Sequence, residues 1–294
     1  MKSMKSAYKY AFIAVFLWST VATAFKFSLI YLSVAELLLI ASLTSFFVLL
    51  IIILVQKKLN LVFLHIKQNF ALVILLGAIN PVLYYLVLFQ AYDLLPAQEA
   101  QSINYTWALM LSLLSVPLLN QKLKITDVIA GIVCYFGVLV ISTKGAPFSL
   151  NFSNTEGVLL ALLSTVLWAL YWIFNTRLKV DSTVGIFSNF LFATPIIILY
   201  YISSQPISLP EISGILSAMY VGLFEMGITF LFWLKAMQNA TNTSKIANLI
   251  FISPFLSLIY IYFILHEPIY ISTIYGLILI IIGLIIQQKL CPKK

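Results

Sequence analysis

Residues 214–232 read GILSAMYVGLFEMGITFLF, an apolar run long enough to cross the hydrocarbon core of a membrane as one helix. A single charged residue, Glu225, stands near its middle. A charge at that depth costs about 2.5–3.5 kcal/mol even on lenient insertion scales, so it is kept where it faces a watery cavity or an opposite charge. Lys26 lies inside another apolar run, residues 11–31. The two charges predict a polar pathway through a membrane protein.

The rest of the chain has the same character. Apolar residues make up 62% of it and charged residues only 9%, too little charge for the surface of a soluble protein. The sequence therefore predicts an all-α integral membrane protein with ten transmembrane helices and no soluble domain between them. The predicted segments are Tyr10–Tyr31, Val34–Val55, Phe70–Tyr92, Ala97–Leu119, Asp127–Ser142, Glu156–Leu178, Thr183–Ile202, Ile212–Leu234, Thr243–Leu265 and Tyr270–Gln288.

Lysine and arginine gather in alternate loops. Lys57 and Lys58 follow the second segment and Arg177 and Lys179 follow the sixth, whereas the opposite loops contain only Lys144. Because cytoplasmic loops carry the excess of positive charge, we predict that both termini are cytoplasmic. The net charge of +8 follows from this asymmetry and from contact with anionic lipid headgroups, and nucleic-acid binding is not expected.

The two halves of the chain resemble one another. Trp18 stands in FLWST in the first segment, and Trp168 stands in VLWAL in the sixth. We predict two five-helix repeats, residues 1–148 and 149–294. Because five is odd, the second repeat enters the membrane from the opposite side. Inverted repeats are typical of secondary transporters, whose site lies at the repeat interface near the bilayer midplane.

A family resemblance is carried by residues 231–268, LFWLKAMQNATNTSKIANLIFISPFLSLIYIYFILHEP. An alanine (Ala236) ends one helix, a small polar turn follows at residues 239–243, a proline (Pro254) lies in the next helix, and an acidic residue (Glu267) closes it. This pattern resembles the EamA family of the drug/metabolite transporter superfamily. The resemblance implies ten helices in an inverted repeat, with a central cavity lined mainly by helices one, three, four, six, eight and nine.

Two stretches of the first half resemble one branch of that family. LWST at residues 17–20 and INYTW at residues 103–107 are similar to the aromatic amino-acid exporters. The resemblance implies that amino acids or related compounds are the substrates.

Polar residues of the first segment share one face. Ser19, Thr23 and Lys26 are spaced by four and three residues, which places them on one side of a helix. We expect this face to line the cavity; the alternative is that Lys26 reaches the outer headgroups. Glu225 shares its helix face with Thr229 and is too central to reach a headgroup, so we expect it in the cavity.

Residues 97–119 begin with more polarity than a lipid-facing surface tolerates. Gln101 and Tyr105 share a helix face that Asn104 borders. These side chains form hydrogen bonds either to substrate or to neighbouring helices. Glu99, near the outer end, is expected to be solvated.

Aromatic residues and helix breaks complete the candidate set. Trp168, Trp172 and Asn175 form a stripe that serves either a cavity or packing, and prolines follow Asn80 and Asn248 closely enough to bend their helices. The predicted cavity residues are Ser19, Thr23, Lys26, Asn80, Tyr84, Gln101, Asn104, Tyr105, Trp168, Trp172, Asn175, Glu225 and Asn248.

Catalytic patterns do not appear in the sequence. It contains no glycine-rich phosphate loop followed by lysine and no nucleophile elbow, and His65 and His266 fall on opposite membrane sides. We therefore expect no enzyme, no cofactor and no metal site.

The sequence is best explained as a secondary transporter of small metabolites in a bacterial inner membrane. We expect it to export amino acids or related compounds by alternating access, with protons as the coupling ion through Glu225, as a monomer or homodimer. Three alternatives stay open: efflux of drugs or lipophilic cations anchored by Glu225, transport of nucleotide sugars, for which basic cavity residues are too few, and a receptor or assembly subunit without transport.

Overall fold

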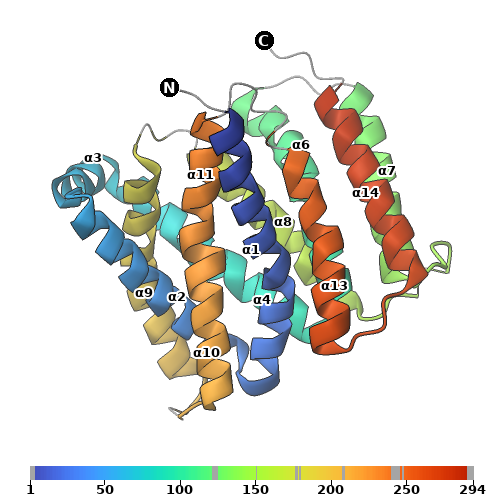
Figure 1. Ribbon diagram of the computed structural model, residues 1–294, viewed down its shortest axis with the longest axis horizontal. Coiled ribbons are helices and arrows are strands. Elements are labelled where there is room, and N and C mark those ends of the chain that lie inside the picture. The colour runs from blue at the N-terminus through green and yellow to red at the C-terminus, as the bar shows by residue number, and fades with distance from the viewer. Residues whose placement is uncertain are drawn as a thin grey trace. The chain divides into compact units, whose positions relative to one another are not determined.

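The computed structural model describes residues 4–120, 125–149, 151–175, 178, 180–206, 209–239, 246 and 248–289, and its regular elements there are helices (Figure 1). Eight helical stretches in these ranges are long and apolar enough to cross a membrane. The last two predicted segments correspond to shorter apolar helices, Leu249–Leu265 and Ile271–Gln287. The prediction of an all-α membrane protein is confirmed.

Helix α2 spans the predicted residues without a shift, whereas α1 and α3 begin six and eleven residues before the predicted Tyr10 and Phe70. The elements are α1 (Met4–Tyr31), α2 (Val34–Val55), α3 (Leu59–Gly77), η1 (Ala78–Leu83), α4 (Tyr84–Leu94), α5 (Ala97–Asn104), α6 (Trp107–Leu119), α7 (Ile125–Ser142), α8 (Thr155–Asn175), α9 (Ser182–Ser204), α10 (Ile212–Tyr220), η2 (Val221–Ile228), α11 (Thr229–Asn239), η3 (Asn248–Ile252), α13 (Ser253–Leu265) and α14 (Ile271–Lys289).

The helices form two compact units, each built from both halves of the chain. The first unit comprises Met1–Val82 and Val180–Glu267, and the second comprises Leu83–Lys179 and Pro268–Lys294. The long helical stretch Leu59–Leu94 belongs to both, because the division falls between Val82 and Leu83.

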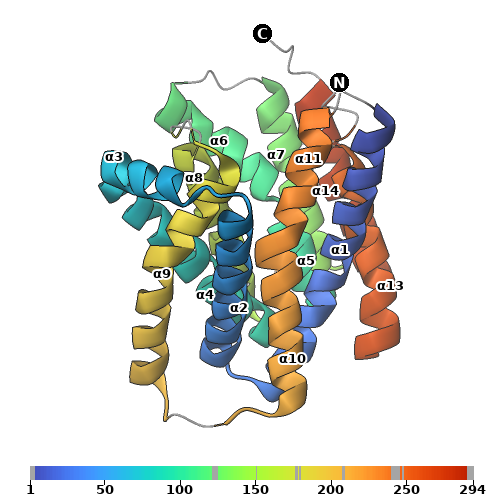
Figure 2. The same cartoon turned by 60° about the vertical axis from the view of Figure 1, so that its left-hand side comes forward.

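In the first unit, α1 packs against α10, α11 and α13, and α2 packs against α9 and η2. Figure 2 shows α2 between α9 and α10. Helix α2 begins with a capping box, in which Ser33 Oγ accepts from the Glu36 amide and Glu36 Oε2 accepts from the Ser33 amide (2.8 Å). Its contact with η2 requires glycine at 222, where a Cβ would meet Ala41 O and Thr44 Cβ.

Two π-helical segments, η1 and η2, lie among the described helices. Asn80 in η1 leaves the helical conformation (φ −141°, ψ 116°) directly before Pro81, whose ring disfavours a helical residue ahead of it. The second segment, η2, is a π-helix of eight residues that contains Glu225. π-Helical turns disturb the regular hydrogen-bond ladder and are frequent at functional sites.

In the second unit, α7 and α14 lie side by side (Figure 1). A Cβ on Gly137 would lie 2.6 Å from Gly276 O, and one on Gly276 would lie 2.6 Å from Gly137 O. Gly283 approaches Cys134 in the same way. These glycines let the two backbones touch. Helices α4 and α6 pack on α8, and α5 contacts α8, α7 and α14.

Candidate functional site

Four aromatic residues surround Trp168 of α8 in the second unit. The Trp168 ring stacks on Tyr84 of α4, with centroids 4.6 Å apart, and on Tyr171, with centroids 5.6 Å apart. Trp107 of α6 and Trp172 meet it edge-on, at 6.5 Å and 5.9 Å. Tyr84 and Trp168 are both buried. We call these five residues the aromatic cluster, and it brings together three residues that the sequence predicted.

The cluster has a polar edge. Asn104 Nδ2 donates a hydrogen bond of 3.0 Å to Ser164 Oγ, and Ser164 stands one helical turn before Trp168 on α8. The indole nitrogen Nε1 of Trp172 is buried and has no acceptor among the described residues. A buried indole N–H ordinarily finds a partner, so this donor is available to a bound molecule.

The predicted helix Ala97–Leu119 is broken next to Asn104. Helix α5 ends there, Tyr105 and Thr106 form a turn, and α6 begins at Trp107. The Thr106 hydroxyl donates to Ile103 O (2.8 Å), a local bond that competes with the helical ladder. The predicted segment Ala97–Leu119 has the bounds of one of the eight candidate membrane spans, and this turn, which a hydropathy sum does not register, lies inside it.

The polar start of α5 serves packing more than predicted. The Gln98 side chain bonds Pro268 O, the Tyr270 amide and Thr273 Oγ1, which fixes α5 to the start of α14. Glu99 is only 3% exposed, so the expectation that it is solvated was wrong. Its partner Ser153 comes from the loop before α8.

Three further predicted residues belong to the second unit. Gln101 on α5 is buried, whereas Tyr105 and Asn175 are half-buried. The second unit thus holds Tyr84, Gln101, Asn104, Tyr105, Trp168, Trp172 and Asn175.

In the first unit, the predicted polar face of α1 is largely buried. Ser19 is fully buried and donates to Phe16 O, so its hydroxyl is already used within the helix. Thr23 is 4% exposed, and its Oγ1 has no hydrogen-bond partner in the described ranges. Lys26 and Glu225 are half-buried.

Hydroxyl contacts fix the register of α1 against α10. Ser28 Oγ donates to Ser217 Oγ (2.9 Å), and the Thr20 and Tyr220 hydroxyls are 2.7 Å apart. These contacts hold the segment before η2, which contains Glu225, against the half of α1 that contains Lys26.

Two further predicted residues lie at the helix breaks. Asn80 is buried at the break of η1, and its Oδ1 has no hydrogen-bond partner among the residues that the structure describes. The Asn248 side chain lies outside the described residues, as do Arg177 and Lys179, which carried the orientation argument. The first unit thus holds Ser19, Thr23, Lys26, Asn80, Glu225 and Asn248.

Comparison with known proteins decides the family. Residues 5–143 and 155–287 each match the EamA-like transporter family. The chain belongs to this family. As the resemblance predicted, this EamA-like chain is an integral membrane protein of a family whose members are transporters, with a small-molecule substrate and a lipid environment.

Relatives of this EamA-like transporter extend over most of its length. The uncharacterized transporter YvbV of Bacillus subtilis strain 168 is 25% identical over 74% of this chain and 72% of its own. The aromatic amino acid exporter YddG of Ancylobacter novellus is 25% identical over 51% of this chain and 53% of its own. A solved crystal structure, 22% identical and covering 97% of both chains, has the same fold with a TM-score of 0.67.

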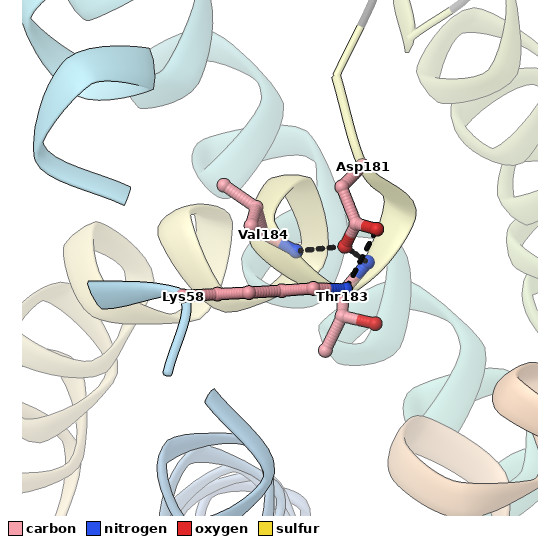
Figure 3. Close-up of polar contacts among 4 residues, drawn as sticks. All are labelled: Lys58, Asp181, Thr183 and Val184. Atoms are coloured by element: carbon pink, nitrogen blue, oxygen red, sulfur yellow. Dashed lines mark hydrogen bonds and ion pairs between the residues drawn. The ribbon is translucent and has the colours of Figure 1, made fainter. Parts of the chain in front are cut away.

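One ion pair of the EamA-like fold was missed by sequence reasoning. Lys58 Nζ, after α2, lies 2.8 Å from Asp181 Oδ2 (Figure 3). Asp181 caps α9 and also accepts from the Thr183 and Val184 amides. Partial burial raises the pKa of Asp181, but the bonds from Lys58 and the two amides outweigh it, so the pKa lies below its ordinary value. Its position ahead of Ser182 is a helix-start signal, but no local pattern indicates Lys58.

Proposed function

We propose that this EamA-like transporter exports amino acids or related small metabolites by alternating access. In this proposal ten helices form two inverted five-helix repeats, residues 1–148 and 149–294, in a bacterial inner membrane with both termini in the cytoplasm. Two successive family matches of similar length support the repeats. The alternation of lysine-rich and lysine-poor loops supports the orientation.

The observation that carries the proposal is the aromatic cluster together with the Trp172 indole N–H, which has no acceptor among the described residues. Stacked rings offer flat apolar surface to an aromatic or aliphatic side chain. Trp172 Nε1, buried without an acceptor in the described part of the chain, suits the polar head of the same molecule. Amino acids combine these two chemistries, and one distant relative is named an aromatic amino acid exporter.

The proposed coupling ion is the proton, with Glu225 as its carrier. Glu225 is half-buried in the π-helix η2, and α1 packs against that segment with Thr23 among its buried residues. A carboxylate that gives up and regains a proton links transport to the proton gradient. The proposal keeps the predicted cavity residues of each unit: Ser19, Thr23, Lys26, Asn80, Glu225 and Asn248 in the first, and Tyr84, Gln101, Asn104, Tyr105, Trp168, Trp172 and Asn175 in the second.

Export from proteoliposomes tests the substrate class. Candidate amino acids are chosen first by comparing metabolites of cells that lack or overproduce the protein. Trp172→Phe keeps a ring but removes the N–H, so we expect export to fall about tenfold, roughly 1.4 kcal/mol, at unchanged Tm. Trp233→Phe is the matched control, because Trp233 packs on Trp18 in the first unit. Equal export by the wild type and Trp172→Phe contradicts the assigned site.

Efflux of lipophilic cations is the second candidate, favoured by the half-buried Glu225 carboxylate. In that case Glu225→Gln abolishes cation efflux and Trp172→Phe leaves it intact. A receptor or assembly subunit without transport is indicated if neither substrate class crosses the membrane.

A further inference from the structure

A second polar site lies in the second unit around Glu99, outside the aromatic cluster. Glu99 stands in the first turn of α5 and is 3% exposed. Ser153, in the loop before α8, donates from Oγ to Glu99 Oε2 at 2.6 Å. The Ser153 amide donates to Ser142 O at the end of α7 (3.1 Å). Three chain segments therefore meet at one carboxylate.

Two side-chain oxygens at this meeting point have no hydrogen-bond partner among the described residues. Ser142 is fully buried, and its backbone oxygen accepts from the amide of Ser153, the residue that donates to Glu99. Yet neither Ser142 Oγ nor Glu99 Oε1 makes a hydrogen bond to any residue that the structure describes. Serine and threonine in helices often donate back to a preceding carbonyl, as Thr143 does to Leu139 O (2.6 Å). Ser142 Oγ makes no such bond, so its lone pairs stay available.

We propose that Glu99 Oε1 and Ser142 Oγ, together with Ser153 Oγ, bind a sodium ion. Carboxylate and hydroxyl oxygens are the hard ligands that such cations prefer, and water can complete the shell. One carboxylate balances one positive charge. Ser153 is exposed, which opens the site to the solution. This site is separate from the proposed substrate and proton pathway and does not depend on it.

The site is held by its surroundings. Three hydrogen bonds of the neighbouring Gln98 fix the first turn of α5 to Pro268, Tyr270 and Thr273. A cation site requires such support, because ligands held in place lose less entropy when the ion binds.

Lys144 adds a positive charge beside the site. Its ammonium is exposed, lies 5.5 Å from the centroid of the Tyr270 ring, and is close enough to affect the Glu99 carboxyl. This nearby positive charge weakens the binding of a cation, so its removal strengthens it.

Thermal unfolding of the purified full-length protein tests the proposal, with sodium chloride against choline chloride at equal ionic strength. We expect sodium to raise Tm by about 2–4 °C at ten times its dissociation constant. Ser142→Ala and Glu99→Gln remove this shift. Lys144→Gln lowers the sodium concentration for half the shift about threefold, because a repelling charge is gone. Glu156→Gln, an exposed acid in the first turn of α8, keeps the wild-type response.

Three results would overturn the sodium site. The first is an equal Tm of the wild type in sodium and choline. The second is a sodium response that survives in Ser142→Ala, a variant that keeps the carboxylate and so avoids confusion with loss of folding. The third is a Tm that follows pH but not sodium, which means that Glu99 takes up a proton instead. Transport enters none of these measurements, so failure here is distinct from failure of the proposed function.

Discussion

The α7–α14 contact and the aromatic cluster are both buried helix interfaces of the second unit, yet they are built in opposite ways. Between α7 and α14, Gly137 and Gly276 bring backbone against backbone. Around Trp168, four further rings from α4, α6 and α8 pack against its indole, and Trp172 Nε1 stays without an acceptor in the described ranges. The close backbone contact in the first interface leaves no room for a ligand and fixes α7 against α14. The second has spare hydrogen-bonding capacity, which a site for a ligand requires.

The largest effect is expected from adding a side chain at Gly276. In Gly276→Val the new Cβ meets Gly137 O and Ile141 Cγ1, and a backbone oxygen cannot move aside as a flexible side chain can. We expect a loss of about 3 kcal/mol or more in stability, seen as lower folded yield and Tm. The matched control is Gly131→Ala on α7, where a Cβ meets only Leu109 Cδ2 at 4.0 Å. If the two variants are equally stable, α7 and α14 do not touch as described.

Glu225→Gln extends the comparison to the first unit. The change keeps the shape of the side chain and removes its charge. If Glu225 carries the coupling proton, we expect export to fall at least about tenfold, roughly 1.4 kcal/mol, while insertion and Tm stay normal. The measurement is export from proteoliposomes across a pH series. Full export with an unchanged pH profile would remove Glu225 from the mechanism.

Asn104→Leu tests whether the polar edge of the aromatic cluster belongs to the site or to packing. The change removes the bond to Ser164 Oγ and any bond to substrate. We expect export to fall about fivefold, close to 1 kcal/mol, with the yield of folded protein retained. If export and the yield of folded protein fall together, Asn104 serves packing between helices and not substrate binding.

The smallest effect is expected at the Lys58–Asp181 pair. Because the folded protein lowers the pKa of Asp181, the pair contributes stability at neutral pH. That contribution declines below the ordinary aspartate pKa, near pH 4, and is lost as the pH falls through the lowered pKa. The Asp181 side chain is 41% exposed, so screening limits the contribution to less than about 1 kcal/mol. Unfolding of wild type and Lys58→Met between pH 3 and 7 measures it; equal pH dependence would mean that Lys58 contributes nothing.

Local patterns predicted most of the helices, because hydropathy over twenty residues is a property of neighbours along the chain. The capped start of α2 and the break before Pro81 are likewise local. The errors concern partners distant in sequence or turns inside apolar runs. Glu99 is covered by Ser153, 54 residues away, and Lys58 meets Asp181 across 123 residues. Of the cluster, Tyr84, Trp168 and Trp172 were predicted from their chemistry, whereas Trp107 carried no polar signal beyond its ring.

The division of the chain into units also bears on the order in which the protein is made. Helix α1 packs against α10, α11 and α13, which leave the ribosome long after it. Likewise, the α7 surface around Gly137 has no packing partner until α14, the last helix described, has been made. Both units therefore stay open during most of translation. The early helices must be shielded by lipid or by the insertion machinery, and neither unit closes until the final third of the chain has entered the bilayer.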